Sequence, residues 1–167
     1  MAAPTRRRGE RALRLDHFLP YRLSIAANAV SRVIASAYEE RFGLSVPEWR
    51  LIAVLHEYGS CTQQDLVRLT LMDKVTVSRA AIALSGRRLI DRARDAKDGR
   101  ARRVKLSRSG QALHARIAPA ALDYEAELLA RFAPAEIDAL RAMLEKWEEA
   151  AKKLAGGDDL LPAEASS

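Results

Sequence analysis

The chain has 167 residues, which suits one domain with a real core and leaves little room for a second. Apolar residues make up 49% of it and the net charge is +6, so we expect a globular protein with a polyanionic partner and not a disordered tail. A single cysteine excludes an intramolecular disulfide framework and fits a reducing cytoplasm, and no apolar run reaches the roughly 20 residues of a membrane span.

The N-terminal part of the chain combines a basic arm with an amphipathic helix. Residues 1–15 include three consecutive arginines and little that could be buried, so we expect a flexible arm, with contact to a DNA backbone as the alternative. Residues 16–43 contain a predicted helix from Pro20 to Arg41, ended by Gly43. Its apolar stripe recurs at steps of three and four residues, at Leu19, Leu23, Ala26, Val30, Val33 and Ala37.

Residues 44–107 begin with two further helices. Ser45 and Glu48 have the spacing of a capping box, and the helix that they start is expected to end at Gly59. Thr62 opens a third, short helix that is separated by only about three residues from the next. Two short helices joined by a tight turn are typical of a helix-turn-helix.

The next helix, at about residues 73–87, is the predicted recognition helix. Asp73 is a good N-cap residue, and no helix breaker follows it. Val77, Ala81 and Leu84 share one face, while Arg79 points away from it. A helix of small residues with its polar groups near the N-terminus fits the major groove of DNA.

A basic two-stranded ribbon is predicted at about residues 89–106. Its apolar residues alternate, and the pair Asp98-Gly99 at its centre is a strong hairpin signal. Between Arg92 and Lys105, two acidic residues stand against seven basic ones: Arg92, Arg94, Lys97, Arg100, Arg102, Arg103 and Lys105. A ribbon with so many charged residues does not suit a buried position in the hydrophobic core. Together with the helices it predicts a winged helix-turn-helix.

Residues 108–155 are expected to form two more helices, followed by a disordered tail at residues 156–167. The last helix carries a narrow apolar seam at Ile137, Leu140, Leu144, Trp147, Ala151 and Leu154. The predicted fold is therefore mainly α with a small β-wing, a winged helix-turn-helix flanked by N- and C-terminal dimerisation helices. A two-fold dimer would place two recognition helices about 34–36 Å apart, one turn of DNA.

Several short motifs lie between Asp16 and Leu154. They are Trp49-Arg50-Leu51, Thr62-Gln63-Gln64-Asp65-Leu66, the run from Met72 to Arg79, and the wing from Asp95 to Ala101 that leads into Leu106-Ser107-Arg108-Ser109-Gly110. In these motifs the chain resembles the MarR family of bacterial transcription regulators. The resemblance implies a cytoplasmic homodimer with intertwined terminal helices that binds short palindromes on double-stranded DNA. It also implies release, in many members, by small and often aromatic acids.

The resemblance also assigns candidate DNA contacts. It implies that Arg100 enters the minor groove and that Asp98 orients it, and a narrow groove does attract an inserted arginine. Arg79 is expected on a base edge, with a solvated surface arginine as the alternative, and Lys74 is expected on a phosphate. The full set of candidates is Thr62, Gln63, Lys74, Thr76, Ser78, Arg79, Lys97, Asp98, Arg100 and Arg102.

Four residues are candidates for an effector pocket. Tyr21 and Arg22, with Trp49 and Arg50, could pair an aromatic wall with guanidinium groups, which suits an aromatic carboxylate or its thioester. The alternative, that the aromatic residues belong to the core and the arginines to salt bridges, remains equally open.

Other kinds of site are not supported by the sequence. Cys61 is expected to be a small buried or cap-adjacent thiol, with an oxidation switch as the alternative. The three histidines lack the spacing of metal ligands, and no phosphate loop or nucleophile–base pair is present, so we expect no metal, cofactor or enzymatic activity. A second hypothesis for the function is a winged-helix module whose basic surface holds an acidic protein or RNA.

Overall fold

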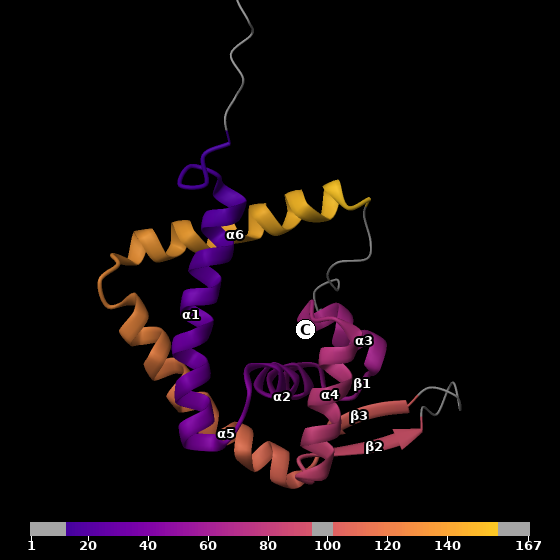
Figure 1. Cartoon of the computed structure of the whole chain (residues 1–167). Coiled ribbons are helices and arrows are strands. Elements are labelled where there is room, and N and C mark those ends of the chain that lie inside the picture. The colour runs from indigo at the N-terminus through magenta and orange to yellow at the C-terminus, as the bar shows by residue number, and fades with distance from the viewer. Residues whose placement is uncertain (1–12, 95–101, 157–167) are drawn as a thin grey trace, which may run out of the picture.

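The computed structural model describes residues 13–94 and 102–156, and Figure 1 shows how their elements are arranged. A compact unit of short helices and a small sheet lies beside an open frame of three long helices. The unit contains α2 (Val46–Tyr58), β1 (Cys61–Thr62), α3 (Gln63–Thr70), α4 (Lys74–Gly86), β2 (Ile90–Arg94) and β3 (Arg102–Leu106). The frame contains α1 (Leu19–Phe42), α5 (Arg108–Leu129) and α6 (Pro134–Leu154). The predicted fold class, mainly helical with a small wing, is confirmed.

Parts of three predicted segments lie outside the described residues. These are residues 1–12 of the basic arm, residues 95–101 at the predicted wing turn, and residues 157–167 of the predicted tail.

The starts of the short helices follow the capping signals in the sequence. The Ser45 hydroxyl accepts the Glu48 N–H at 3.4 Å, and the Glu48 carboxylate accepts the Ser45 N–H at 2.7 Å. The same reciprocal bonds join Thr62 and Asp65, at 3.1 and 2.8 Å, before α3. These caps satisfy N–H groups that the first turn of a helix leaves without partners. Both predicted helix starts are confirmed.

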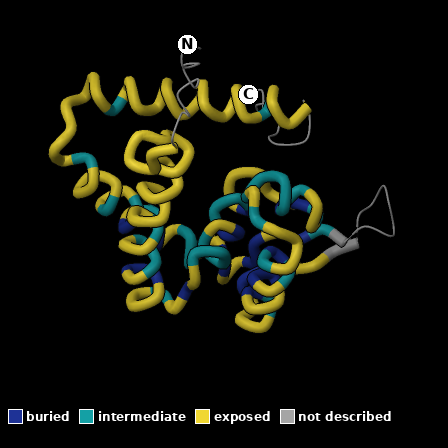
Figure 2. Tube along the Cα trace, turned by 45° about the horizontal axis from the view of Figure 1, so that its top comes forward, coloured by how far each residue is buried: buried dark blue, intermediate teal, exposed yellow. Residues whose placement is uncertain are grey.

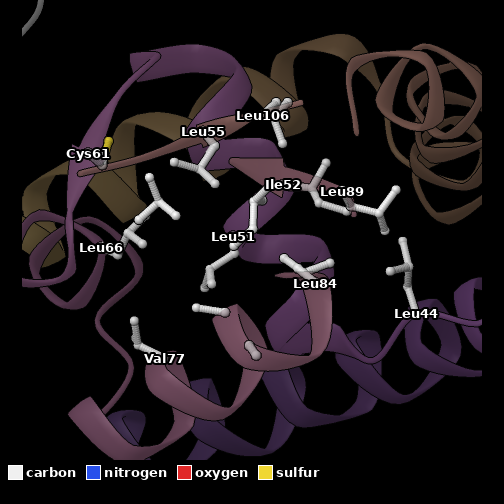
Figure 3. Packing of buried hydrophobic residues seen from close by; sticks show 14 of the residues in the cluster. Leu44, Leu51, Ile52, Leu55, Cys61, Leu66, Val77, Leu84, Leu89 and Leu106 are labelled. Atoms are coloured by element: carbon white, nitrogen blue, oxygen red, sulfur yellow. The ribbon is translucent and has the colours of Figure 1, made fainter. Parts of the chain in front are cut away.

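The hydrophobic core lies inside the compact unit, where leucine and isoleucine side chains from α2, α3, α4 and the sheet point toward one another (Figure 3). Leu51, Ile52 and Leu84 are completely buried, and full burial of such a side chain stabilises the fold by about 1.5–3 kcal/mol. Val77 and Ala81 join them, so the predicted inner face of α4 is confirmed.

The sheet has one strand more than the predicted ribbon. The strands β2 and β3 pair in antiparallel fashion, with Ile90 opposite Leu106, and β1 adds to the other edge of β3 through Cys61 opposite Val104. A strand of two residues is too short to show an alternating pattern, and tertiary pairing alone creates it. It ties the start of α3 to the base of the wing.

Two of the long helices, α1 and α6, expose most of their apolar residues, as their yellow tube in Figure 2 shows. Only Ala37 and Tyr38 are buried in α1, and α6 has no buried residue. Among the described residues, no helix is long and apolar enough to cross a membrane.

Candidate nucleic-acid interface

The N-terminus of α4 is held by its cap. The Asp73 carboxylate accepts the Thr76 N–H at 2.9 Å and the Thr76 hydroxyl at 2.6 Å. These bonds, from the hydroxyl first and then from the backbone, lower the pKa of Asp73 below its usual value of 3.8. The cap thus remains ionised at neutral pH, where its charge also complements the positive end of the helix dipole.

The outer face of α4 presents its cations to solvent. Lys74 and Arg79 are both exposed, and Val75 beside them is 57% exposed. The part of the chain that the structure describes shows no ion pair at either cation. An arginine held on an exposed helix face can reach a base edge with two parallel hydrogen bonds.

Two grooves flank α4, and they separate the predicted polar contacts. Thr76 and Arg79 line a groove of about 360 Å³ toward the start of α2. Ser78 lines a larger groove of about 510 Å³, which also contains Thr62, Gln63, Gln64, Arg92 and Arg103. Ser78 and Thr76 therefore lie on opposite sides of the helix.

The larger groove adds residues that the sequence did not single out. Gln64 and Arg92 lie in it with Thr62 and Gln63, because β1 brings the start of α3 beside the sheet. Arg103 also lies there, and its guanidinium donates to the Ser60 hydroxyl at 3.2 Å and to the Ser60 carbonyl. Gln64 stands next to a predicted contact in the sequence, and Arg92 is among the ribbon's cations, but only the third strand places them together.

The hydroxyl of Thr62 is already engaged in the cap of α3. It donates to the Asp65 carboxylate at 2.8 Å and accepts the Asp65 N–H. Burial opposes the charge of Asp65, but hydrogen bonds from Thr62 and Arg68 lower its pKa below 3.8 nonetheless. Thr62 therefore has a structural role whether or not it contacts DNA.

Three of the predicted wing contacts, Lys97, Asp98 and Arg100, lie outside the described residues. The backbone of Arg102 pairs with Arg94 at the outer end of β2 and β3, and its side chain lies outside the described part.

The four predicted effector residues do not form one pocket within a single chain. Tyr21 and Arg22 lie in the first turns of α1, whereas Trp49 packs edge-on against Tyr38 at 5.1 Å between ring centroids. At a rise of about 1.5 Å per residue, Tyr21 is roughly 25 Å from Tyr38 along the helix. Arg50 is exposed and lines a groove of about 590 Å³ between α1 and α2, together with Arg32.

Aromatic rings join the compact unit to the frame. The His114 ring of α5 stacks on the His56 ring of α2 at 3.7 Å and on the Trp49 ring at 5.8 Å between centroids. Burial, and then the neighbouring His56, lower the pKa of His114 below 6.5. The stack is therefore maintained with a neutral imidazole at physiological pH.

Neither a reactive thiol nor a metal site is supported by the geometry. Cys61 is buried, and burial followed by the charge of Asp65 raises the pKa of its thiol, against the opposing effect of Arg103 and Arg68. Within residues 13–94 and 102–156, no group of three or more His, Cys, Asp or Glu side chains could hold a metal ion.

A helix-turn-helix with an exposed cationic recognition helix and an antiparallel ribbon defines a winged helix-turn-helix DNA-binding protein. A model of the MarR family matches residues 42–101, which include α2, α3, α4 and β2. A MarR family transcriptional regulator from Silicibacter pomeroyi is 31% identical, with a TM-score of 0.72 over 90% of this chain and 97% of that one. The chain belongs to the MarR family of transcription regulators, which are not enzymes.

Two solved structures of lower identity show the same fold. One is a MarR family regulator from Streptomyces coelicolor in complex with DNA, at 19% identity and a TM-score of 0.76 over 93% of this chain and 99% of that one. The other is BpsR of Bordetella bronchiseptica, whose DNA binding is regulated by 6-hydroxynicotinic acid. It is 22% identical, with a TM-score of 0.65 over 75% of this chain and 98% of that one. Among curated proteins, no match was found.

Proposed function

We propose that the protein is a homodimeric repressor that binds a palindromic operator. The observation that carries this proposal is the outer face of α4, where Lys74 and Arg79 are exposed. Arg79 lines the groove on one side of the helix and Ser78 the groove on the other. In the proposed complex Arg79 contacts a base edge and Lys74 a phosphate. The DNA complex of the Streptomyces coelicolor protein supports this use of the fold.

The dimer is proposed because the frame helices expose apolar residues that a second copy would cover. Val33 of α1 is 52% exposed, and Met143 and Trp147 of α6 are 53% and 40% exposed. Burying such residues removes apolar surface from water, at about 25 cal/mol for each Å². The same assembly presents two copies of α4 to one face of DNA, which a palindrome requires.

The wing completes the proposed contact at the flanking minor groove. By the family resemblance, Arg100 inserts into that groove and Asp98 orients it; both lie outside the described residues. Substitution Arg100→Ala should weaken operator binding by about 1–3 kcal/mol at about 150 mM salt. A loss of only a few per cent of the affinity would contradict this role of the wing.

An anionic effector is proposed for the groove between α1 and α2. Two guanidinium groups, from Arg32 and Arg50, line it together with the apolar side chains of Ile25, Ala35 and Val46. Two arginines beside apolar walls suit an aromatic carboxylate or its thioester. Regulation of BpsR by 6-hydroxynicotinic acid, an aromatic acid, is consistent with this chemistry. Tyr21 and Arg22 do not line this groove, although Ile25, one helical turn further along α1, does.

The decisive experiment is footprinting of the DNA upstream of the chain's own reading frame, with and without aromatic acids. We expect a protected palindrome that overlaps the promoter, and protection that an effective acid removes. The palindrome should outcompete bulk DNA by at least about a thousandfold. Equal competition by bulk DNA would contradict the proposal and favour the second candidate, a basic winged-helix module that holds an acidic protein or RNA.

A further inference from the structure

The loop that follows the recognition helix makes a side-chain contact with the frame. Arg87 terminates α4: its N–H donates to the Ala83 carbonyl, and the N–H of Arg88 donates to the Ser85 carbonyl. Its guanidinium reaches back across the fold and donates to the Gly43 carbonyl at 2.7 Å and to the Phe42 carbonyl at 3.0 Å. One side chain therefore joins the end of α4 to the end of α1.

The two accepting carbonyls lie where α1 gives way to α2. Gly43 adopts a left-handed conformation, with φ of 60°, and its N–H donates to Glu39. The carbonyls of Phe42 and Gly43 come too late in the chain to receive a bond within α1, so they need an outside donor. They also carry the negative end of the helix dipole, which favours a cation. Arg87 supplies both the donors and the charge.

The backbone of the same loop is tied to α5. The Ser107 hydroxyl donates to the Arg88 carbonyl at 2.8 Å, and the Ser107 N–H donates to the Leu89 carbonyl at 3.0 Å. Gly110 of α5 lies against the same Leu89 carbonyl, with room only for a hydrogen atom. Residues 87–89, which we call the junction, thus connect the recognition helix to two frame helices.

We propose that Arg87 is a positioning residue that sets the orientation of α4 relative to α1, and through it the spacing of the two recognition helices in the dimer. This inference rests on the proposed function. The Tyr38 ring of α1 already packs on the Trp49 ring of α2. The guanidinium of Arg87 adds two hydrogen bonds from the side of the recognition helix, and these fix the angle between α4 and α1.

An arginine is needed because a single forked group must serve two neighbouring carbonyls. The planar guanidinium can donate from two nitrogens at once in a fixed geometry. A lysine has one nitrogen on a flexible stem, so Arg87→Lys should restore the charge and only part of the positioning. If only the charge at position 87 mattered, the lysine variant would show the same preference for operator spacing as the wild type.

The first test measures tolerance to operator spacing. A duplex is selected by the wild-type protein from a randomised library, and variants of it are made with one base pair added or removed between the half-sites. For Arg87→Ala we expect the preference for the original spacing over the altered spacings to fall by about 2- to 30-fold. Partial unfolding would lower the apparent affinity for all the duplexes by the same factor and leave this ratio unchanged. Arg116→Ala, which removes the same charge from an exposed position on α5, should also leave the ratio unchanged.

The second test needs neither DNA nor a dimer. Nitroxide labels are placed at Ser24→Cys on α1 and Ala83→Cys on α4 in a Cys61→Ala background, and labelled chains are diluted with unlabelled protein. Dipolar spectroscopy should give one narrow distance distribution with Arg87 and a broader or shifted one with Arg87→Ala. An unchanged distribution would overturn the inference, whatever the DNA result. If the wild type selects no palindrome while the distribution broadens, the proposed function fails and the positioning role of Arg87 stands.

Discussion

Arg79 and His114 are two residues whose chemistry depends on how the fold presents them. Arg79 stands on the face of α4 opposite the buried Val77 and Ala81, so its cation stays in solvent. The His114 ring is half-buried against the His56 and Trp49 rings, so protonation of the ring is disfavoured. Arg79 is therefore available to a binding partner, whereas His114 contributes to packing within the chain.

Replacing Arg79 with alanine should weaken operator binding by about 1–3 kcal/mol and relax base preference at one position of each half-site. The physical reason is the loss of two hydrogen bonds to a base edge. Fluorescence anisotropy at a fixed salt concentration measures the effect, with Arg116→Ala as a control for the loss of charge. Equal losses for the two variants would show that Arg79 acts only through non-specific attraction.

The His114 ring should make stability depend on pH. Its folded-state pKa lies below 6.5, so the unfolded chain binds the proton more readily, and the free energy of unfolding falls as the pH drops from above 6.5 toward the folded pKa. Substitution His114→Gln should flatten this slope between about pH 7.5 and 5, where carboxylates of ordinary pKa remain ionised. Urea denaturation at one protein concentration measures it. His17→Gln, at an exposed histidine, is the control, and an unchanged slope in His114→Gln would contradict the assignment.

At the scale of elements, α5 determines where the frame meets the recognition helix. Its N-cap is Ser107, whose hydroxyl accepts the Gly110 N–H at 3.0 Å and donates to the Arg88 carbonyl of the junction. Beyond this start the helix continues through Pro119 to Leu129. The close approach of α5 to the junction needs a residue without a side chain, and Gly110 meets that need.

Substitution Gly110→Ala should therefore destabilise the protein by at least about 2 kcal/mol, in the range of severe packing defects. The new Cβ would lie 2.0 Å from the Leu89 carbonyl oxygen, which belongs to the backbone and cannot turn aside. Thermal or urea unfolding measures the change. Gly86→Ala is the matched control, because nothing lies within 4 Å of its Cβ, and in a helix it should be neutral or stabilise by up to about 1 kcal/mol. Equal stability of the two variants would contradict the contact.

At the scale of the whole molecule, the chain divides into a unit with its own core and a frame without one. The buried cluster includes residues of α2, α3, α4 and the sheet, together with Tyr38 and Ile117 where α1 and α5 touch it. In α6 no residue is buried, although its seam has the spacing of a helix that packs on another helix. The proposed dimer would cover this seam with a second copy of the frame.

Substitution Leu144→Glu in the seam should convert the proposed dimer to monomers and abolish tight binding to the palindrome. An unpaired carboxylate costs far more free energy when it is buried against apolar surface than when it is exposed to water. Sedimentation velocity measures the mass, and anisotropy the binding. Ala142→Glu adds the same charge about half a turn away, on the opposite face of α6, and should leave the dimer intact. Dissociation by both variants would show that charge, and not the seam, is responsible.

Much of this fold could be predicted because its signals are local. The capping residues Ser45, Thr62 and Asp73 start their helices where the sequence indicates, since each side chain satisfies N–H groups only three residues away. The spacing of Val77, Ala81 and Leu84 likewise determines which face of α4 is buried. From such signals alone, the winged helix-turn-helix and the exposed position of Arg79 follow.

Only the tertiary structure decided the contacts between segments distant in the chain. The strand at Cys61–Thr62 exists because β3 lies beside it, and it brings Gln64 and Arg92 to one groove. The distance along α1 separates Tyr21 from Trp49, which only one of the two alternatives drawn from the sequence grouped in a pocket. The bonds from Arg87 to the end of α1 join residues more than forty positions apart. Periodicity and capping act within a few residues, whereas these pairings depend on packing between elements, which no local pattern encodes.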